Sequence, residues 1–438
     1  MKLKKVVAIT MTLVMLLSSS ICFSGCNKVT ASNVMKDCNY FYTQEFECEL
    51  PYKDEIAVTK DITSYCVIDN SIFAVVNATT IDSDNPDGEM NFHQDIVEYS
   101  LENGEILNIF DGQELKDSVT EPGAISFLEL KSIFEEDGKL RLFYFDDDIS
   151  SGKFGYKVLK TGTLDSKNGT IKDFKTLSDV SYCTGDYEEI GYASNPIIKT
   201  SDGYVLPIYS YLIAATAVPC RFLVFDSNGL KGSVDCSNEF PSDVYEAPES
   251  FAFTGDSSIV GKCISMHDGK IDYSINLKTF DFEVNPDTSV IGDLEPVAVN
   301  DELSLAVSDE GVFIYDNGEY NMTVDFNFSD INLYEAQSSK PIYCNDNMIL
   351  LVPRTRDGEL TILKITGSED NPYEGKTKLT IADVNNDIDY KTSEAIRAFN
   401  KENPDYYIEV KFYEKDSELD GLYALTDVTN RILVDMAN

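Results

Sequence analysis

The sequence predicts a mainly β fold, namely a β-propeller of about six blades, followed by an incomplete α/β segment. Two observations support this prediction. From about residue 61 to residue 367, β-rich runs alternate with Asp-Gly or Asn-Gly turns, which is the pattern of successive antiparallel hairpins. Similar units also return every roughly 40 to 65 residues, at or above the period of four-stranded propeller blades. Paired β-sandwiches are the alternative, but the propeller also explains the repeat.

The chain opens with an export signal, assigned to residues 1–25. Lysines at positions 2, 4 and 5 precede an uncharged apolar run from Val6 to Leu17, which is the order found in a secretory signal peptide. The run is shorter than the ~20 apolar residues that cross a bilayer comfortably. An uncut N-terminal membrane anchor is the alternative interpretation, and both interpretations place the rest of the chain outside the cytoplasm.

A candidate lipidation site follows the apolar run. Small residues lead to Cys26, with Phe23 three positions before it. This arrangement resembles the lipobox of bacterial lipoproteins, although that family usually has Leu where this chain has Phe23. The resemblance implies that Cys26 receives a diacylglyceryl group and becomes the new N-terminus. We therefore expect a lipidated tether over residues 26–35 and a protein held on the extracytoplasmic face of the cell membrane.

Residues 36–367 are assigned to the propeller-like domain. Each expected hairpin has a turn that favours left-handed backbone conformations, flanked by strand-like runs. The strand-like runs include Leu140–Phe145, Tyr204–Tyr209 and Met348–Val352. The pattern is similar to that of degenerate β-propellers without a named signature. The turns are Asn103-Gly104, Asp137-Gly138, Asn168-Gly169, Asp202-Gly203, Asn228-Gly229, Asp268-Gly269, Asn317-Gly318 and Asp357-Gly358.

Composition excludes several classes of function. The 438 residues carry 76 acidic groups against 35 basic ones, a net charge of −41, which argues against nucleic acid and anionic lipid as partners. Only two histidines occur, His93 and His267, and neither lies in a zinc or catalytic-triad motif. No phosphate-binding glycine loop is present, so we expect no enzyme activity and no cofactor. Beyond Cys22 and Cys26, the eight remaining cysteines allow either disulfides or buried free thiols.

The texture of the chain changes after residue 367. A polar linker over 368–377 contains proline and glycine. A strand at 379–382, a helix at about 392–401, an alternating strand at 408–412 and a helix from about residue 427 are predicted next. The order β-α-β-α is typical of an α/β domain with a parallel sheet. The segment is assigned to residues 378–438.

This segment resembles the beginning of a bacterial extracellular solute-binding protein, the receptor component of ABC importers. The resemblance rests on the runs Leu379–Ala382, Ala395–Pro404 and Ile408–Tyr413, with a further likeness at Thr429–Leu433. A Gly-x-x-Pro-Asp turn usually follows in that family, whereas this chain stops at Asn438, so we expect a truncated domain. Another small α/β appendage is the alternative.

In that family, the loop after the first strand often faces the ligand. The resemblance implies that Asp383, Asn385, Asp387 and Tyr390 contact a small polar solute such as a sugar. The alternative is a connecting loop in which Asp389 caps the following helix.

The same loop also has the oxygen spacing of a calcium site. Asp383, Asn385, Asp387, Asp389 and Glu394 occupy positions 1, 3, 5, 7 and 12 of such a loop. Ile388 stands where that loop needs glycine, so this remains a weak candidate and we expect no metal.

The predicted function is therefore a non-catalytic, membrane-anchored receptor lipoprotein of an ABC importer. Its expected partners are the membrane, through the N-terminal lipid, an ABC permease and a small polar solute, with no nucleic acid. The alternative is a surface interaction or scaffold lipoprotein that works through its β-propeller.

Overall fold

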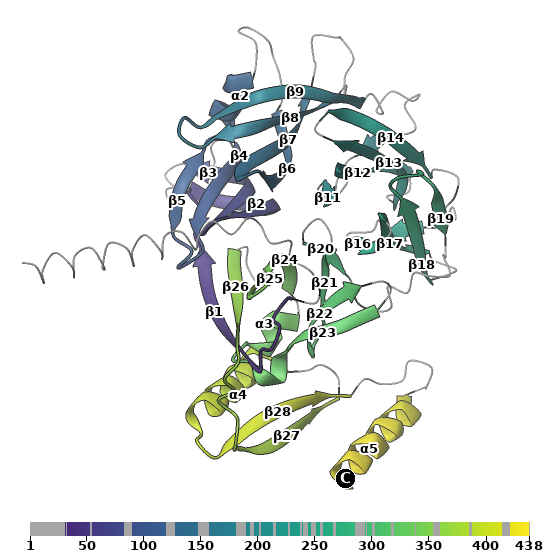
Figure 1. Ribbon diagram of the computed structural model, residues 1–438. Coiled ribbons are helices and arrows are strands. Elements are labelled where there is room, and N and C mark those ends of the chain that lie inside the picture. Colours follow the sequence, from purple (N-terminus) through teal and green to yellow (C-terminus); the bar gives the residue numbers. More distant parts are fainter. Residues whose placement is uncertain are drawn as a thin grey trace, which may run out of the picture.

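The computed structural model is a six-bladed β-propeller with a small α/β unit on its rim (Figure 1). The fold class predicted from the sequence is confirmed, and the alternative of paired β-sandwiches is wrong. The structure describes residue 31 and residues 33–437 with the exception of 53–54, 83–89, 120–127, 148–156, 181–189, 193–196, 201–202, 213–215, 227, 237–238, 240–243, 247–250, 255–256, 266–268, 285–293, 295, 300–302, 317–318, 338, 354–359, 385–387 and 414–420.

The first three blades are antiparallel meanders. Blade one has β2 (Glu55–Ile68), β3 (Ser71–Asp82), β4 (Met90–Ser100) and β5 (Ile106–Phe110). The helix α2 (Gly112–Val119) leads to blade two, which has β6 (Leu128–Glu136), β7 (Lys139–Asp147), β8 (Lys157–Asp165) and β9 (Thr170–Val180). Blade three has two short inner strands, β10 (Ile190–Tyr192) and β11 (Ile198–Thr200), followed by β12 (Gly203–Leu212), β13 (Thr216–Asp226) and β14 (Gly229–Asp235).

Blades four and five continue the same order. Blade four has the inner strands β15 (Val244–Glu246) and β16 (Phe251–Thr254), then β17 (Ser258–Ser265), β18 (Gly269–Asn276) and β19 (Phe282–Val284). Blade five has β20 (Val297–Ala298), β21 (Ser304–Val307), β22 (Gly311–Asp316) and β23 (Glu319–Asp325). The turn η3 (Phe326–Phe328) and the short helix α3 (Leu333–Gln337) lead to the last blade.

The last blade closes the ring with a strand from the other end of the chain. Its inner strands are β24 (Ser339–Asn345), β25 (Met348–Pro353) and β26 (Leu360–Ser368), and its outer strand is β1 (Tyr40–Cys48). β1 pairs antiparallel with β26 from Tyr40 opposite Ser368 to Cys48 opposite Leu360. Because β1 precedes blade one in sequence, this pairing joins the first and last parts of the propeller.

The connections between strands lie on two opposite faces of the propeller, and the tight turns share one of them. Tight turns join the first strand of a blade to the second and the third to the fourth, and several use left-handed residues such as Asp69 (φ 52°), Asp137 (φ 53°) and Gly169 (φ 62°). The connections between blades leave the opposite ends of the strands, as α2 does after β5 and as η3 does after β23. In an antiparallel meander these ends lie on the other face, which therefore carries the longer loops.

The α/β unit lies beyond the rim of blades five and six (Figure 1). It consists of β27 (Thr377–Asp383), α4 (Tyr390–Glu402), β28 (Tyr406–Phe412) and α5 (Gly421–Ala437). β27 and β28 are parallel, with Leu379 beside Ile408 and Ile381 beside Val410. α5 begins six residues before its predicted start at about residue 427, whereas the other three elements lie within two residues of their predicted bounds.

The α/β unit shares a hydrophobic core with the propeller. Ile388, Ile396 and Val410 belong to the same buried cluster as Leu305 of blade five and Ile349 of blade six. The segment between β26 and β27, predicted as a linker, contains Tyr373, which is 5% exposed and stacks on a ring from β28. The unit is therefore packed onto the propeller.

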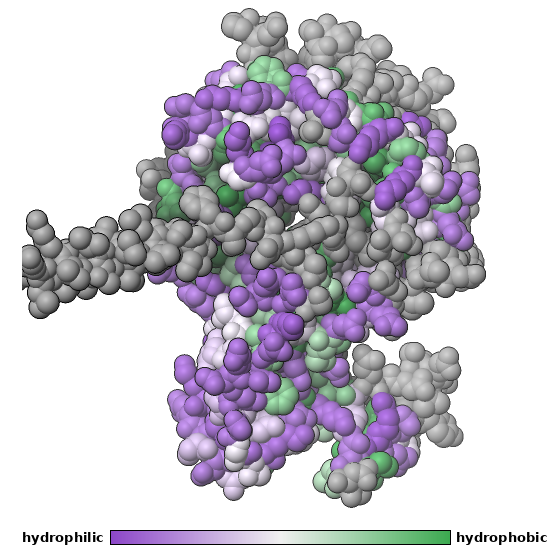
Figure 2. Space-filling view, in the orientation of Figure 1, coloured by the Kyte–Doolittle hydropathy of each residue, from purple (hydrophilic) through white to green (hydrophobic). Residues whose placement is uncertain are grey.

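The surface over the described part of the propeller is mainly hydrophilic (Figure 2), as expected from the large number of charged residues in the sequence. Among the cysteines whose side chains the structure describes, four are free thiols, namely Cys38, Cys48, Cys66 and Cys344, and the last three of these are buried. Among the described residues, no helix has the length and apolar character needed to cross a membrane.

Candidate functional site

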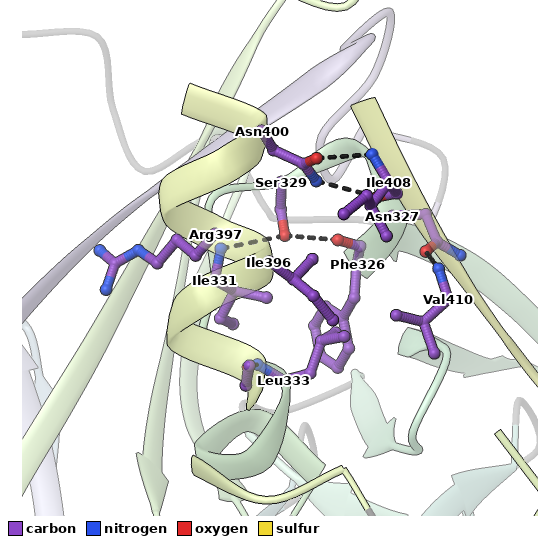
Figure 3. Close-up of a pocket in the computed structure, with 11 residues that line it drawn as sticks. Phe326, Asn327, Ser329, Ile331, Leu333, Ile396, Arg397, Asn400, Ile408 and Val410 are labelled. Carbon is purple, nitrogen blue, oxygen red and sulfur yellow. Dashed lines mark hydrogen bonds between the residues drawn. The ribbon is translucent and has the colours of Figure 1, made fainter. Parts of the chain in front are cut away.

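Two asparagine side chains bind the edge of β28, one from within the α/β unit and one from the propeller. Asn400 of α4 donates from Nδ2 to the Ile408 carbonyl (2.9 Å) and accepts from the Ile408 amide (2.6 Å). Asn327, from the propeller, accepts from the Val410 amide (2.8 Å). These bonds occupy the edge of β28 that faces away from β27 (Figure 3). The side chains therefore act in place of a neighbouring strand.

A second set of bonds joins α4 to the connection between blades five and six. Ser393 of α4 is 1% exposed, and its hydroxyl accepts from the Leu333 amide (2.7 Å). Asn332 donates to the Glu394 carboxylate (3.0 Å). A buried amide without such a partner costs free energy, so these contacts fix the helix on the propeller.

The junction between the two parts is closely packed. A pocket at the junction has a volume of about 10 Å³, enough for a single water. Figure 3 shows Arg397 pointing away from it. A pocket of this size cannot hold a solute, so any solute site of the α/β unit lies elsewhere. The pocket is lined by Phe326, Asn327, Ser329, Ile331, Leu333, Ser393, Ile396, Arg397, Asn400, Ile408 and Val410.

The structure places two of the four predicted ligand-binding residues. Asp383 is 8% exposed, and its carboxylate accepts a hydrogen bond from the Ile388 amide (3.2 Å). Tyr390 is partly exposed and meets the Tyr334 ring edge-on, with 6.5 Å between ring centroids. Asn385 and Asp387 lie outside the described residues. Asp383 therefore shapes the loop, and Tyr390 is the predicted residue that is open to solvent.

The remaining members of the calcium spacing have partners within the protein. Asp389 caps α4, because its carboxylate accepts from the Thr392 amide (2.7 Å). Glu394 contacts Asn332 and forms an ion pair with Arg397 (3.2 Å). In the part of the chain that the structure describes, no three His, Cys, Asp or Glu side chains gather as a metal site.

A polar cluster that the sequence did not predict lies at the start of blade one. Glu55 begins the innermost strand, and its carboxylate accepts from the Thr80 hydroxyl and pairs with His93 Nε2 at 3.2 Å. The Tyr52 ring stacks on the His93 ring with centroids 4.2 Å apart. The Tyr52 hydroxyl donates to the buried Asp95 (2.6 Å). The cluster lies on the face that carries the longer connections.

The electrostatics of this cluster keep Glu55 ionised. The Thr80 hydroxyl, followed by His93 and Asn91, lowers the pKa of Glu55 below its usual range. Burial, and then Asp95, raises the pKa of Tyr52. The cluster thus presents a carboxylate and an imidazole whose side chains are 28% and 22% exposed. The spacing of His93 and Asp95, two residues apart on one strand, could have indicated from the sequence that both side chains lie on the same face. No pattern in the sequence indicated that Tyr52 and Glu55 join them.

Comparisons with known proteins find propellers. No family model and no curated protein matches this chain. Solved structures that are similar include Trypanosoma rangeli sialidase with the inhibitor DANA, at 10% identity and TM-score 0.40, covering 74% of this chain and 59% of that one. The chain thus spans less than two thirds of the sialidase. Penicillium chrysogenum α-L-arabinanase is similar at 9% identity and TM-score 0.42, covering 75% and 99%.

A third similar structure is the β-propeller domain of the Trilobed protease from Pyrococcus furiosus, at 11% identity and TM-score 0.33, covering 71% and 97%. These likenesses concern the propeller fold. They correct one prediction, because several similar propellers are glycoside hydrolases, and the expectation of no enzyme activity is not retained. One fold supports many functions, so the missing sequence motifs were too narrow a basis for that exclusion.

Proposed function

We propose that this protein is a lipid-anchored receptor of the solute-binding type on the extracytoplasmic face of the cell membrane. In this proposal the α/β unit takes part in capturing a small polar solute, such as a sugar, for an ABC permease. The observation that supports it most is that the propeller's own core and hydrogen bonds hold the parallel β-α-β unit. The propeller would serve as a rigid mount for that unit.

The N-terminal segment determines which side of the molecule a lipid on Cys26 would hold near the membrane. Val34 and Met35 are buried beside the α/β side of the propeller, with the Met35 amide bonded to the Asp346 carbonyl (2.7 Å). The eight peptide steps from Cys26 to Val34 reach at most about 28 Å. A lipid on Cys26 would therefore hold the rim that carries the α/β unit close to the bilayer, where a permease lies.

The anchor is tested by replacing the acylated thiol. In cells that make the full chain, Cys26→Ser should abolish incorporation of a labelled fatty acid and move the protein out of the membrane fraction. Cys22→Ser is the control, and it should change neither measurement. Labelling of the Cys26→Ser protein would contradict the anchor.

The solute site is tested by titration calorimetry of the full chain with a panel of monosaccharides and oligosaccharides. Tyr390→Ala should weaken binding of any sugar that binds by about fivefold or more, since stacking on a ring contributes ~1 kcal/mol or more. Tyr406→Ala is the matched control, because Tyr406 is similarly exposed (43% against 36%) on the same unit. Absence of binding across the panel, or equal losses in both variants, would count against the receptor.

A second candidate function is a surface interaction lipoprotein that works through the propeller. The Glu55 and His93 pair on the face with the longer connections favours it. A glycan array would test it, with His93→Gln expected to reduce binding and Lys139→Gln, at the start of β7 next to a tight turn, expected to leave binding unchanged. Unaltered binding by His93→Gln would remove this support.

A further inference from the structure

The two edges of the α/β sheet differ. The outer edge of β28 is occupied by the side chains of Asn400 and Asn327, as described above. β27 pairs with β28 alone in the sheet that the structure describes. Six consecutive residues of β27, from Thr377 to Ala382, are exposed. An open strand edge is a template for pairing with another strand, so this sheet can grow on the β27 side only.

The backbone of β27 shows which groups are open. The Thr377 amide donates to the Asp405 carbonyl (2.7 Å), and the Asp383 carbonyl accepts from the Tyr413 amide (2.7 Å). Both contacts lie on the β28 side. Because successive residues turn their amides and carbonyls to alternate sides of a strand, Lys378, Thr380 and Ala382 turn theirs to the open edge. These three residues are symmetric about Thr380.

The side chains of β27 have the same symmetry. Leu379 and Ile381 flank Thr380, lie on the same face of the sheet as Ile408 and Val410, and are 42% and 37% exposed. Exposed apolar residues on an open edge favour association. The exposed residues of the strand also carry none of the acidic charge that dominates the molecule, because its only acidic residue, Asp383, is buried at its end. Residues 375–382 include two lysines and no acidic residue, in a chain of net charge −41.

We infer that the open edge of β27 pairs with β27 of a second copy of this protein. A twofold axis through Thr380 would make the strands antiparallel and place Lys378 opposite Ala382, and Thr380 opposite its own copy. These pairs use the backbone groups that face outward. Leu379 would lie opposite Ile381 of the second copy, in the closer pairing that brings side chains together. The contact would be isologous, as in most dimers.

A second copy fits this edge because the strand complements itself. The same outward groups and the same apolar pair serve both partners. Two acidic molecules can approach here because the exposed residues of the strand, Thr377–Ala382, carry no carboxylate. The result is a four-stranded sheet in the order β28, β27, β27 and β28. This inference does not depend on the solute or on the lipid.

The register is tested by disulfide cross-linking of the purified full chain, with Thr380→Cys and Thr377→Cys compared. In the twofold register the two Thr380 Cα atoms lie about 5.5 Å apart, within the range of a disulfide. The two Thr377 Cα atoms are displaced by six residues along the strands, roughly 20 Å. We expect about tenfold more cross-linked dimer from Thr380→Cys than from Thr377→Cys. The unsubstituted chain measures the background from its own cysteines.

Sedimentation of the purified full chain provides the second measurement. We expect a dimer whose dissociation constant rises about tenfold or more in Ile381→Lys, since a charge would replace an apolar contact. Lys378→Gln is the control and should remain dimeric. Equal cross-linking at both positions, no cross-linking at Thr380, or a monomer would overturn the inference. A monomer with β27 amides protected from exchange would instead place a different strand on this edge.

Discussion

Asp389 shows how one side chain sets the start of an element. It precedes α4, and its carboxylate accepts the Thr392 amide that the helix itself leaves unpaired. This bond favours the ionised carboxylate. The Thr392 amide, and then the Thr392 hydroxyl, therefore lower the pKa of Asp389. The calcium spacing of the sequence includes Asp389, but its carboxylate caps the helix in the structure.

This bond predicts a dependence of stability on pH. The pKa of Asp389 is lower in the folded protein than in the unfolded chain, so the stabilisation is present above about pH 4. It is lost as the pH falls through the folded pKa. Asp389→Asn keeps an oxygen acceptor but cannot titrate. In urea unfolding between about pH 3 and pH 7, the wild type should exceed Asp389→Asn in stability most at neutral pH. An unchanged difference at all pH values would contradict this account.

At the scale of elements, α4 joins the propeller to the α/β unit, which the sequence analysis assigned to separate segments. One face of the helix packs Ile396 into the shared core, and Ser393 and Asn400 bind the propeller and β28. A two-stranded parallel sheet is marginal by itself. Its stability here therefore comes from the propeller.

Ser393 provides a test of this docking. Ser393→Ala leaves the buried Leu333 amide without its partner, which should lower the free energy of unfolding by about 1–3 kcal/mol. Lys391→Ala, at an exposed position in the same turn, should change it by less than about 0.5 kcal/mol. Chemical denaturation measures both variants, and hydrogen exchange should show faster exchange in β27 and β28 of Ser393→Ala. Equal stabilities would show that the hydroxyl is dispensable.

At the scale of the whole molecule, closure of the ring depends on β1. This strand completes the last blade, and its contacts reach the connection before that blade, as in the bond from the Thr43 amide to the Asp330 carboxylate (2.5 Å). In addition, Tyr52 and Glu55 tie the chain after β1 to His93 and Asp95 of blade one. The first and last blades are thus joined by non-covalent contacts.

Two neighbouring aromatic residues of β1 test the closure. Phe41 is 5% exposed and lies in the core between blades five and six, whereas Tyr42 is 47% exposed. Phe41→Ala should cost about 3–5 kcal/mol, and Tyr42→Ala about 1 kcal/mol or less. Thermal unfolding monitored by circular dichroism measures both. Similar losses in the two variants would indicate that ring closure does not rest on the inward face of β1.

Features that depend on short-range chemistry could be predicted from the sequence alone. Turns such as Asp137-Gly138 adopt the left-handed conformations that their residues favour, with φ of 53° and 72°. The alternation of apolar residues predicted β28, and the repeat of hairpins predicted the propeller. Local backbone preference and the periodicity of one buried face suffice for such elements.

Contacts between residues that are distant in sequence could be seen only in the folded structure. Tyr52 and Glu55 join His93, β1 completes a blade more than 300 residues away in sequence, and Asn327 and Asn400 close one edge of a sheet while the edge of β27 stays open. No local pattern encodes these contacts, because each depends on how packed elements bring separate strands together. For the same reason, the calcium spacing suggested a ligand role for Asp389 and Glu394. In the structure Asp389 caps α4, and Glu394 contacts Asn332 and Arg397.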